Sequence, residues 1–190
     1  MNFTYNTSPL MTILAGGNVG IGVTNPSSYW ANANNLVVGG LGAVSGITIA
    51  TDGNLTGSLM FADSTAPADN TRGGLQYNHS NDSMLFRVDN DTKMTILSSG
   101  NVGIGVTLPS APLTVQANGS GGAINIIGRN NGVADESLIS FYEYDGTTRM
   151  AYMLADEGNL IFATGGSTER MRITSGGDIE IPTNSAKIKL

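Results

Sequence analysis

Short runs in which apolar residues alternate with small or polar ones dominate this chain. In Val102-Gly-Ile-Gly-Val106 the outer and central positions are apolar and the two between them are glycine, and Val19 to Val23 repeats this order. A period of two places successive side chains on opposite faces of a strand. No stretch sustains helical apolar spacing over ten residues. The pattern therefore predicts an all-β fold in which each run is a strand with one apolar face.

The residues around each glycine run predict a strand, a turn and a second strand. Met94 and Ile96 share a face of the first strand, and Ser98-Ser-Gly-Asn101 is a turn signal. Pro109 closes the second strand, because proline lacks the ladder N–H. Glycine costs about 0.5–1 kcal/mol relative to alanine in a strand. Two glycines in one run therefore need a reason, usually the close approach of another backbone or a tight corner.

This signature is repeated along the chain. It is MTILAGGNVGIGVTNPS from Met11 to Ser27, MTILSSGNVGIGVTLPS from Met94 to Ser110, and a degenerate MRITSGGDIEIPTNS from Met171 to Ser185. The likeness extends to Leu36–Val38 with Leu113–Val115, Ile47–Ile49 with Ile124–Ile126, and Ser58-Leu59 with Ser137-Leu138. We expect Leu113–Val115 and Ile124–Ile126 to form a further strand pair. Self-similarity at a fixed interval is the mark of a modular array.

The repeat predicts four segments. Residues 1–10 form an N-terminal segment and a candidate docking arm, residues 11–93 are the first β-module, residues 94–170 are the second, and residues 171–190 are a partial third repeat and C-terminal cap. Glu180 stands at a glycine position of the third copy, so that face is expected to be wetter. A polar end cap is what repeat arrays need for solubility.

Composition narrows the classes of function. Lys and Arg together number 9 of 190 residues and the net charge is −6, which argues against binding nucleic-acid phosphate. The absence of cysteine excludes disulfides and thiolate metal sites. No apolar run approaches the roughly 18 residues of a membrane span, so no membrane insertion is expected. We see no basic and apolar secretory signal near Met1.

Several motifs resemble functional sites without completing them. The GIGVT segments at Gly20 and Gly103 lack the third glycine of a dinucleotide fingerprint and are interpreted as structural strands. Asp89-Asn-Asp91 begins like a calcium loop but lacks the later glycine and glutamate, so a surface turn is favoured. An ion bound on the symmetry axis of an oligomer stays an open alternative. His79 is the only histidine and is interpreted as a solvated loop residue.

Acidic and aromatic residues leave two further alternatives. Glu143, Asp145, Asp156 and Glu157 form the densest acidic group, and a pair of carboxylates can hydrolyse glycosides. The favoured interpretation makes Tyr142 to Asp145 an alternating strand and Asp156 to Gly158 a turn. The Tyr29-Trp30 pair is either a sugar platform or a packing anchor, and packing is favoured. We therefore assign no catalytic, cofactor-binding or metal-ligating residue, and expect no enzyme and no cofactor.

The many strand edges and few apolar side chains per strand predict self-association. Open edges aggregate unless they are covered. Closed symmetry would cover them, so we expect an obligate oligomer.

The signature identifies a family. GNVGIGVTNPS and GNVGIGVTLPSAPLTV, with STERMRITSGG leading into and opening the third copy, resemble the GNVGIGTTSPxxxLTV repeats of tail-fibre and related virion proteins of bacteriophages. The likeness covers essentially the whole chain, since ERMRI-type and SLISF-type segments are also typical of these modules. It implies a homotrimer in which strands from three chains pack or intertwine around a long axis, as an elongated fibre or β-prism-like assembly. Three backbones could then approach closely at the glycine strands.

The resemblance implies a non-enzymatic structural protein of the virion: a trimeric tail fibre or spike-like component. Its expected partners are itself, other virion proteins of the tail, baseplate or capsid, and a host-surface glycan. We recognise neither the self-cleaving chaperone domain of many relatives nor a tail-attachment domain, so a capsid decoration (cement or head-fibre) trimer is the first alternative. A polysaccharide-degrading tailspike is the second. The expected contact loops are Ser64 to Thr71 and Gly128 to Glu136.

Overall fold

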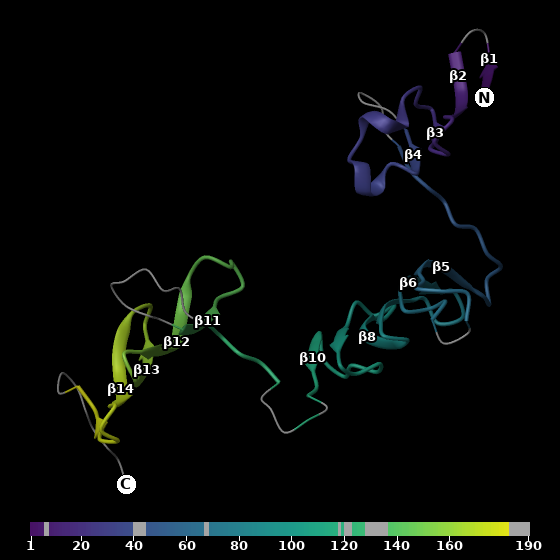
Figure 1. Ribbon diagram of the computed structural model, residues 1–190. Coiled ribbons are helices and arrows are strands. Elements are labelled where there is room, and N and C mark those ends of the chain that lie inside the picture. Colours follow the sequence, from purple (N-terminus) through teal and green to yellow (C-terminus); the bar gives the residue numbers. More distant parts are fainter. Residues whose placement is uncertain are drawn as a thin grey trace. The chain divides into compact units, whose positions relative to one another are not determined.

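The computed structural model describes residues 1–5, 8–39, 45–66, 69–117, 119, 123–127 and 137–182. These residues form strands arranged in three sheets, with two single-turn 3-10 helices (Figure 1). The all-β class predicted from alternation is confirmed. Among the described residues no helix is long and apolar enough to cross a membrane.

The first sheet has the order β1-β2-β3-β4. Its strands are β1 (Asn2–Tyr5), β2 (Ser8–Ile13), β3 (Val19–Ile21) and β4 (Leu36–Val38), and the 3-10 helices Pro26–Ser28 and Ala31–Ala33 lie between the last two. β3 and β4 are parallel, whereas the other neighbours are antiparallel. Residues 1–10, set apart by the sequence as a candidate docking arm, supply β1 and the start of β2.

The second sheet has the order β10-β9-β8-β7-β6-β5. Its strands are β5 (Thr56–Phe61), β6 (Gly73–Asn78), β7 (Ser83–Val88), β8 (Asp91–Ile96), β9 (Val102–Ile104) and β10 (Leu113–Val115). Only β9 and β10 are parallel. The repeat boundary at Met94 lies inside β8, so the sheets are out of phase with the modules of the sequence.

The third sheet is wholly antiparallel and runs in the order β11-β12-β13-β14-β15. Its strands are β11 (Ser137–Tyr142), β12 (Arg149–Asp156), β13 (Asn159–Thr164), β14 (Thr168–Ile173) and β15 (Ile179–Glu180). The chain divides into two compact units, residues 1–116 and 117–190. The first unit holds the first two sheets and the second unit holds the third.

The three signatures adopt the same strand-turn-strand geometry. Met11 pairs with Ile21 and Met94 pairs with Ile104 in identical registers. In each turn the backbone N–H of the first residue donates to a carbonyl four residues on, at 2.9 Å, and a glycine takes a positive φ of 85–91°. The donors are Leu14, Leu97 and Thr174. The predicted strand, turn and glycine strand is confirmed.

The glycine run is shorter as a strand than its alternation predicts. β9 ends at Ile104, and Gly105 turns the chain with a φ of +72°, so Val106 is not part of the strand. A Cβ on Gly103 would collide with the carbonyl oxygen of Val106 and meet Pro109 Cδ at 3.2 Å. The backbone that approaches the glycine closely therefore belongs to the same chain, and the glycine strand does not require three chains.

The expected pairing of Leu113–Val115 with Ile124–Ile126 is wrong. Leu113–Val115 instead pairs in parallel with Val102–Ile104, because the turn after Gly105 and the loop through Pro109 carry the chain back beside β9. Ile124–Ile126 forms no strand. Alternation cannot reveal a loop of this kind, because it predicts which residues form strands but not which strands are neighbours.

Candidate functional site: an apolar face carried by every sheet

Each sheet carries the same cross-strand pair of an aromatic ring and a methionine. Phe86 of β7 lies opposite Met94 of β8, Phe3 lies opposite Met11, and the pair in the third sheet is Phe162 with Met171. A β-bulge follows the phenylalanine in all three ladders. Bulges of this kind bend a strand and fix its register. The sequence analysis identified the methionines but missed the phenylalanines, whose spacing to the methionine varies between 8 and 9 residues.

In the second sheet these pairs belong to one continuous apolar face. Successive register partners place the following side chains on it: Leu59, Phe61, Leu75, Tyr77, Met84, Phe86, Val88, Met94, Ile96, Val102, Ile104, Leu113 and Val115. None of these side chains is charged, but the register also places Asp91 on this face, opposite Val88 at the end of the β7–β8 pair. Phe61 is 63% exposed, and Val88 and Leu113 are each 60% exposed. A face of this size left open to water is the usual mark of an interaction surface.

The other two sheets repeat this face. Register places Phe3, Met11, Ile13, Val19, Ile21, Leu36 and Val38 on the first sheet, and Ile139, Phe141, Met153, Leu160, Phe162, Met171, Ile173 and Ile179 on the third. Among the described strand residues, only Ile161 and Ala163 have buried apolar side chains. Both lie on the opposite surface of the third sheet. The described sheets therefore have apolar faces without a core behind them.

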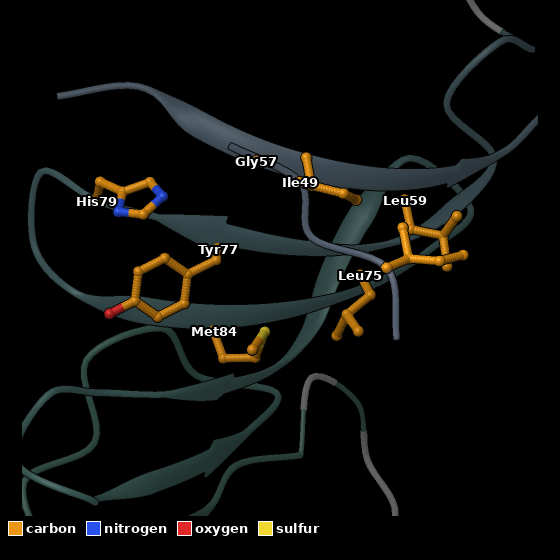
Figure 2. A pocket seen from close by; sticks show the side chains of 8 residues that line it. Ile49, Gly57, Leu59, Leu75, Tyr77, His79 and Met84 are labelled. Atoms are coloured by element: carbon orange, nitrogen blue, oxygen red, sulfur yellow. The ribbon is translucent and has the colours of Figure 1, made fainter. Parts of the chain in front are cut away.

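A pocket lies on the face of the second sheet. It has a volume of about 350 Å³ and is lined by Ile47, Ile49, Gly57, Leu59, Leu75, Tyr77, His79 and Met84. Figure 2 shows these side chains gathered around the pocket from neighbouring strands and from the segment that carries Ile49. In this lining, the polar side-chain groups are the His79 ring and the Tyr77 hydroxyl. The lining fits an apolar group and offers little to orient a polar ligand.

The third sheet has a matching pocket. It is lined by Ile124, Ile126, Ser137, Ile139, Met153, Ala155 and Leu160 and has a volume of about 260 Å³. The registers of the two sheets make Leu59 equivalent to Ile139 and Leu75 equivalent to Met153. The predicted correspondence of Ile47–Ile49 with Ile124–Ile126 thus holds in space. The correspondence of Ser58-Leu59 with Ser137-Leu138 is one residue out of register, and such a slip exchanges the faces of a strand.

The opposite face is closed near the first two signatures. Thr12 and Thr95 are 3% and 1% exposed. Pro26 and Pro109 are buried beside the glycines that pair with these two threonines. The loops after β3 and β9 therefore cover this side from within the chain. In the part of the chain that is described, neither threonine hydroxyl has a hydrogen-bond partner.

In the third copy, charged residues stand at the positions that are closed in the first two signatures. Arg172 stands in the register position of Thr95, and Glu180 in that of Gly103. Arg172 donates two hydrogen bonds to the Glu169 carboxylate, at 2.7 and 2.6 Å. This contact lowers the pKa of Glu169 and raises that of Arg172. The side chain of Glu180 is exposed, as the sequence predicted for a wetter third copy.

The four acidic residues do not form one site. Glu143 and Asp145 precede β12, whereas Asp156 is its last residue and Glu157 follows it, so the length of this eight-residue strand separates the two acidic pairs by roughly 23 Å. Glycosidase carboxylates lie about 5–9.5 Å apart. The Asp145 carboxylate instead accepts hydrogen bonds from the Thr148 hydroxyl and the N–H groups of Thr147 and Thr148, which lower its pKa to about 2.

The expected strand through Tyr142 to Asp145 ends at Tyr142, where the hairpin turn begins. The expected turns at Asp156 to Gly158 and at Asp89 to Asp91 are confirmed. His79 lies in a turn, as expected, but is half-buried, and its ring meets that of Tyr77 edge to face at 4.8 Å. Tyr77 donates a hydrogen bond to Asp82 at 3.1 Å, which raises the tyrosine pKa.

Trp30 is not a packing anchor within the described chain, because its side chain is 73% exposed. In the expected contact loop, Ser64 donates to Asp69, and Arg72 forms ion pairs with Asp63, Asp69 and Asp89. The second expected contact loop, Gly128 to Glu136, lies outside the described residues.

Within the described ranges, no group of three or more acidic or histidine side chains is placed to hold a metal ion. No family model matches this chain, and no curated protein matches it either.

Proposed function

We propose that this chain is a non-enzymatic structural subunit of a bacteriophage particle, and that three copies assemble into a tail fibre or spike-like component of the virion. The partners in this proposal are the other copies of the chain, a neighbouring protein of the tail, baseplate or capsid, and a glycan on the host surface.

The observation that carries the proposal is the repetition of one open apolar face on all three sheets. An enzyme domain packs such faces into a core around a single site. Here the faces of Phe3, Phe86 and Phe162 stay open, while a fixed strand-turn-strand frame recurs beneath them. Repetition of one surface along a chain suits assembly and display. It also lets weak contacts with a host act together, because a linked set of sites binds more tightly than each site alone.

The acidic residues support a structural role. Asp145 caps a hairpin turn, and Asp89 contributes to an ion pair beside another. Carboxylates held in this way stabilise the loop in which they lie. A polysaccharide-degrading tailspike would need a carboxylate pair elsewhere.

The test is to locate the chain on purified phage particles that encode it, with antibodies raised against the recombinant protein and gold-labelled for electron microscopy. A tail fibre predicts few gold particles, confined to the tail. A capsid decoration protein predicts tens to hundreds of copies on the head, and that outcome would replace the tail assignment by the first alternative. Pre-immune serum is the control. Absence of the chain from the particle would overturn the proposal.

A further inference from the structure

We infer that the loop from Pro26 to Asn35, which joins β3 to β4, is a binding site for an uncharged sugar, with the indole of Trp30 as its platform. This inference rests on the host-glycan contact in the proposed function. It adds the residues that make the contact and the class of glycan that they accept.

The loop is longer than the fold requires. The parallel pairs β3–β4 and β9–β10 have the same register. Nine residues, 27–35, separate the buried Pro26 from β4, whereas three residues, 110–112, separate the buried Pro109 from β10. The second sheet therefore makes the same connection without the six extra residues. Loops of this kind, carried on a fixed scaffold, are where binding residues concentrate.

Both ends of the loop are held to the first sheet. At the start, the side-chain amide of Asn18 donates a hydrogen bond to the Ser27 hydroxyl at 3.2 Å. At the end, the backbone N–H of Val19 donates to the Asn35 carbonyl at 2.8 Å. Because two neighbouring residues at the start of β3 anchor the two ends, the extra residues stand on a fixed base, as a binding site requires.

Trp30 is presented to solvent by this loop. It lies between the two 3-10 helices, Pro26–Ser28 and Ala31–Ala33. Its side chain is 73% exposed, whereas the neighbouring Tyr29 is half-buried. Tryptophan is highly buried on average, so this indole is a flat surface that the described fold does not use. The face of an aromatic ring is electronegative, and it attracts the partially positive C–H groups on one face of a pyranose ring.

Three asparagines follow Trp30 in the loop. Asn32 and Asn35 are exposed, and Asn34 is half-buried. A side-chain amide offers two donor hydrogens and one acceptor oxygen, which suits sugar hydroxyls because each of these also donates and accepts. An aromatic platform in an asparagine-rich loop therefore favours a glycan over a purely apolar ligand.

The charge of this part of the chain selects a neutral ligand. The first 51 residues contain no side chain of Asp, Glu, Lys, Arg or His, and the first charged side chain is that of Asp52. Nucleic-acid phosphate is bound by Lys and Arg, and carboxylates are matched by Arg. The first sheet and its loops offer neither residue. A nucleic acid or an acidic polysaccharide would find no counter-charge here, whereas a neutral sugar needs none.

The binding test uses the full-length protein and soluble neutral oligosaccharides of glucose, galactose, mannose and N-acetylglucosamine, with oligogalacturonate as the acidic comparison. Trp30 is the only tryptophan, so the intrinsic fluorescence reports this loop directly. We expect a saturable change in emission with at least one neutral oligosaccharide and none with oligogalacturonate. The affinity should be the same at about 50 and 500 mM NaCl, because salt screens interactions between charges and no charged side chain takes part.

Two variants, studied by saturation-transfer NMR, locate the bound sugar. Trp30→Ala removes the platform and should abolish the transfer signal, whereas Trp30→Phe keeps a ring and should retain weaker binding. In the second variant, residues 27–35 are replaced by the Ser-Ala-Pro sequence of residues 110–112, which makes the same connection in the second sheet. This loop replacement should keep the unfolding midpoint and bind no sugar. Circular dichroism shows whether it folds, and Trp30→Ala decides the matter if it does not.

Three outcomes would overturn the inference. The first is that no neutral oligosaccharide binds. The second is binding that is confined to oligogalacturonate or that weakens with salt. The third is binding of a neutral sugar that survives Trp30→Ala, which would place the sugar elsewhere on the chain. Failure to find the chain on a phage particle would overturn its assignment to the virion and leave the sugar-binding results unchanged.

Discussion

Phe86 and Met94 face each other across the β7–β8 ladder, immediately before a β-bulge that leaves Lys93 unpaired with β7. The same aromatic–methionine pair and the same bulge occur in the first and third sheets. A sulfur beside an aromatic ring stabilises by about 0.3–1.5 kcal/mol, and the bulge fixes which residues share the face. This pair therefore marks the structural repeat more faithfully than the glycine run, which is lost in the third copy.

Gly103→Ala is expected to destabilise the protein by about 1–3 kcal/mol, the usual cost of forcing extra atoms into a packed site. The added Cβ would collide with the Val106 carbonyl and crowd Pro109. Urea unfolding at fixed protein concentration measures the change. Gly53→Ala is the matched control, because no heavy atom lies within 4 Å of its Cβ position. Equal midpoints for the two variants would show that the loop after β9 does not pack against Gly103.

Thr95→Val is expected to stabilise the protein by about 1 kcal/mol. The side chain is 1% exposed, and among the described residues its hydroxyl has no hydrogen-bond partner. An unsatisfied buried hydroxyl is costly, and a methyl group of the same shape removes that cost. Thermal unfolding measures the shift, and Thr95→Ser, which keeps the hydroxyl and loses the methyl, should be destabilising. A loss of stability in Thr95→Val would reveal a hydrogen bond to the hydroxyl.

Alternation was sufficient to predict the strands of the signature, because each has one apolar face. It could not predict that Leu113–Val115 pairs with β9, since pairing depends on the path of the loop that begins at Gly105. Alternation also predicted that the glycine strand continues to Val106. The positive φ of Gly105 ends the strand earlier, but the order of apolar and small residues runs through this turn unchanged. The turn becomes visible only when the backbone is traced.

The candidate site, like the fold, was predicted from the sequence only in part. The methionines were found because they occupy one position in a conspicuous signature, whereas Phe86 and Phe162 precede it at 8 and 9 residues from the methionine. The bulge and the length of the hairpin turn absorb this difference. Leu59 was aligned one residue away from its true equivalent, Ile139, because the flanking serines match better than the faces do.

Asp145 is expected to stabilise its hairpin turn at neutral pH and to lose this effect in strong acid. Hydrogen bonds from Thr148 and Thr147 lower its pKa to about 2 in the folded chain, whereas an unfolded aspartate titrates near pH 3.9. A folded pKa below the unfolded one stabilises above the unfolded pKa, and the effect disappears as the pH falls through about 2. Asp145→Asn should therefore be less stable than wild type at pH 7 and approach it near pH 2. A stability difference independent of pH would contradict this.

The paired contact of Arg172 with Glu169 is expected to contribute modestly to the third sheet. Both side chains are about a third exposed or less, and ion pairs near the surface are worth up to about 1 kcal/mol. Glu169→Gln should lower stability by that order at pH 7. Because the pKa of Glu169 is lowered in the folded chain, the difference should shrink as the pH falls below the usual glutamate range. Unfolding in 1 M salt is the control, since screening should narrow the same difference.

Trp30→Ala is expected to leave the unfolding midpoint nearly unchanged, because substitutions at exposed positions usually alter stability by less than about 0.5 kcal/mol and this side chain is 73% exposed. Trp30 is the only tryptophan, so its fluorescence reports this site alone. If the indole stacks on a host glycan, isolated host polysaccharide should shift its emission to shorter wavelength, and Trp30→Ala should weaken adsorption while Trp30→Phe largely preserves it. A large loss of stability in Trp30→Ala, with emission already typical of a buried indole, would instead identify Trp30 as part of a subunit contact.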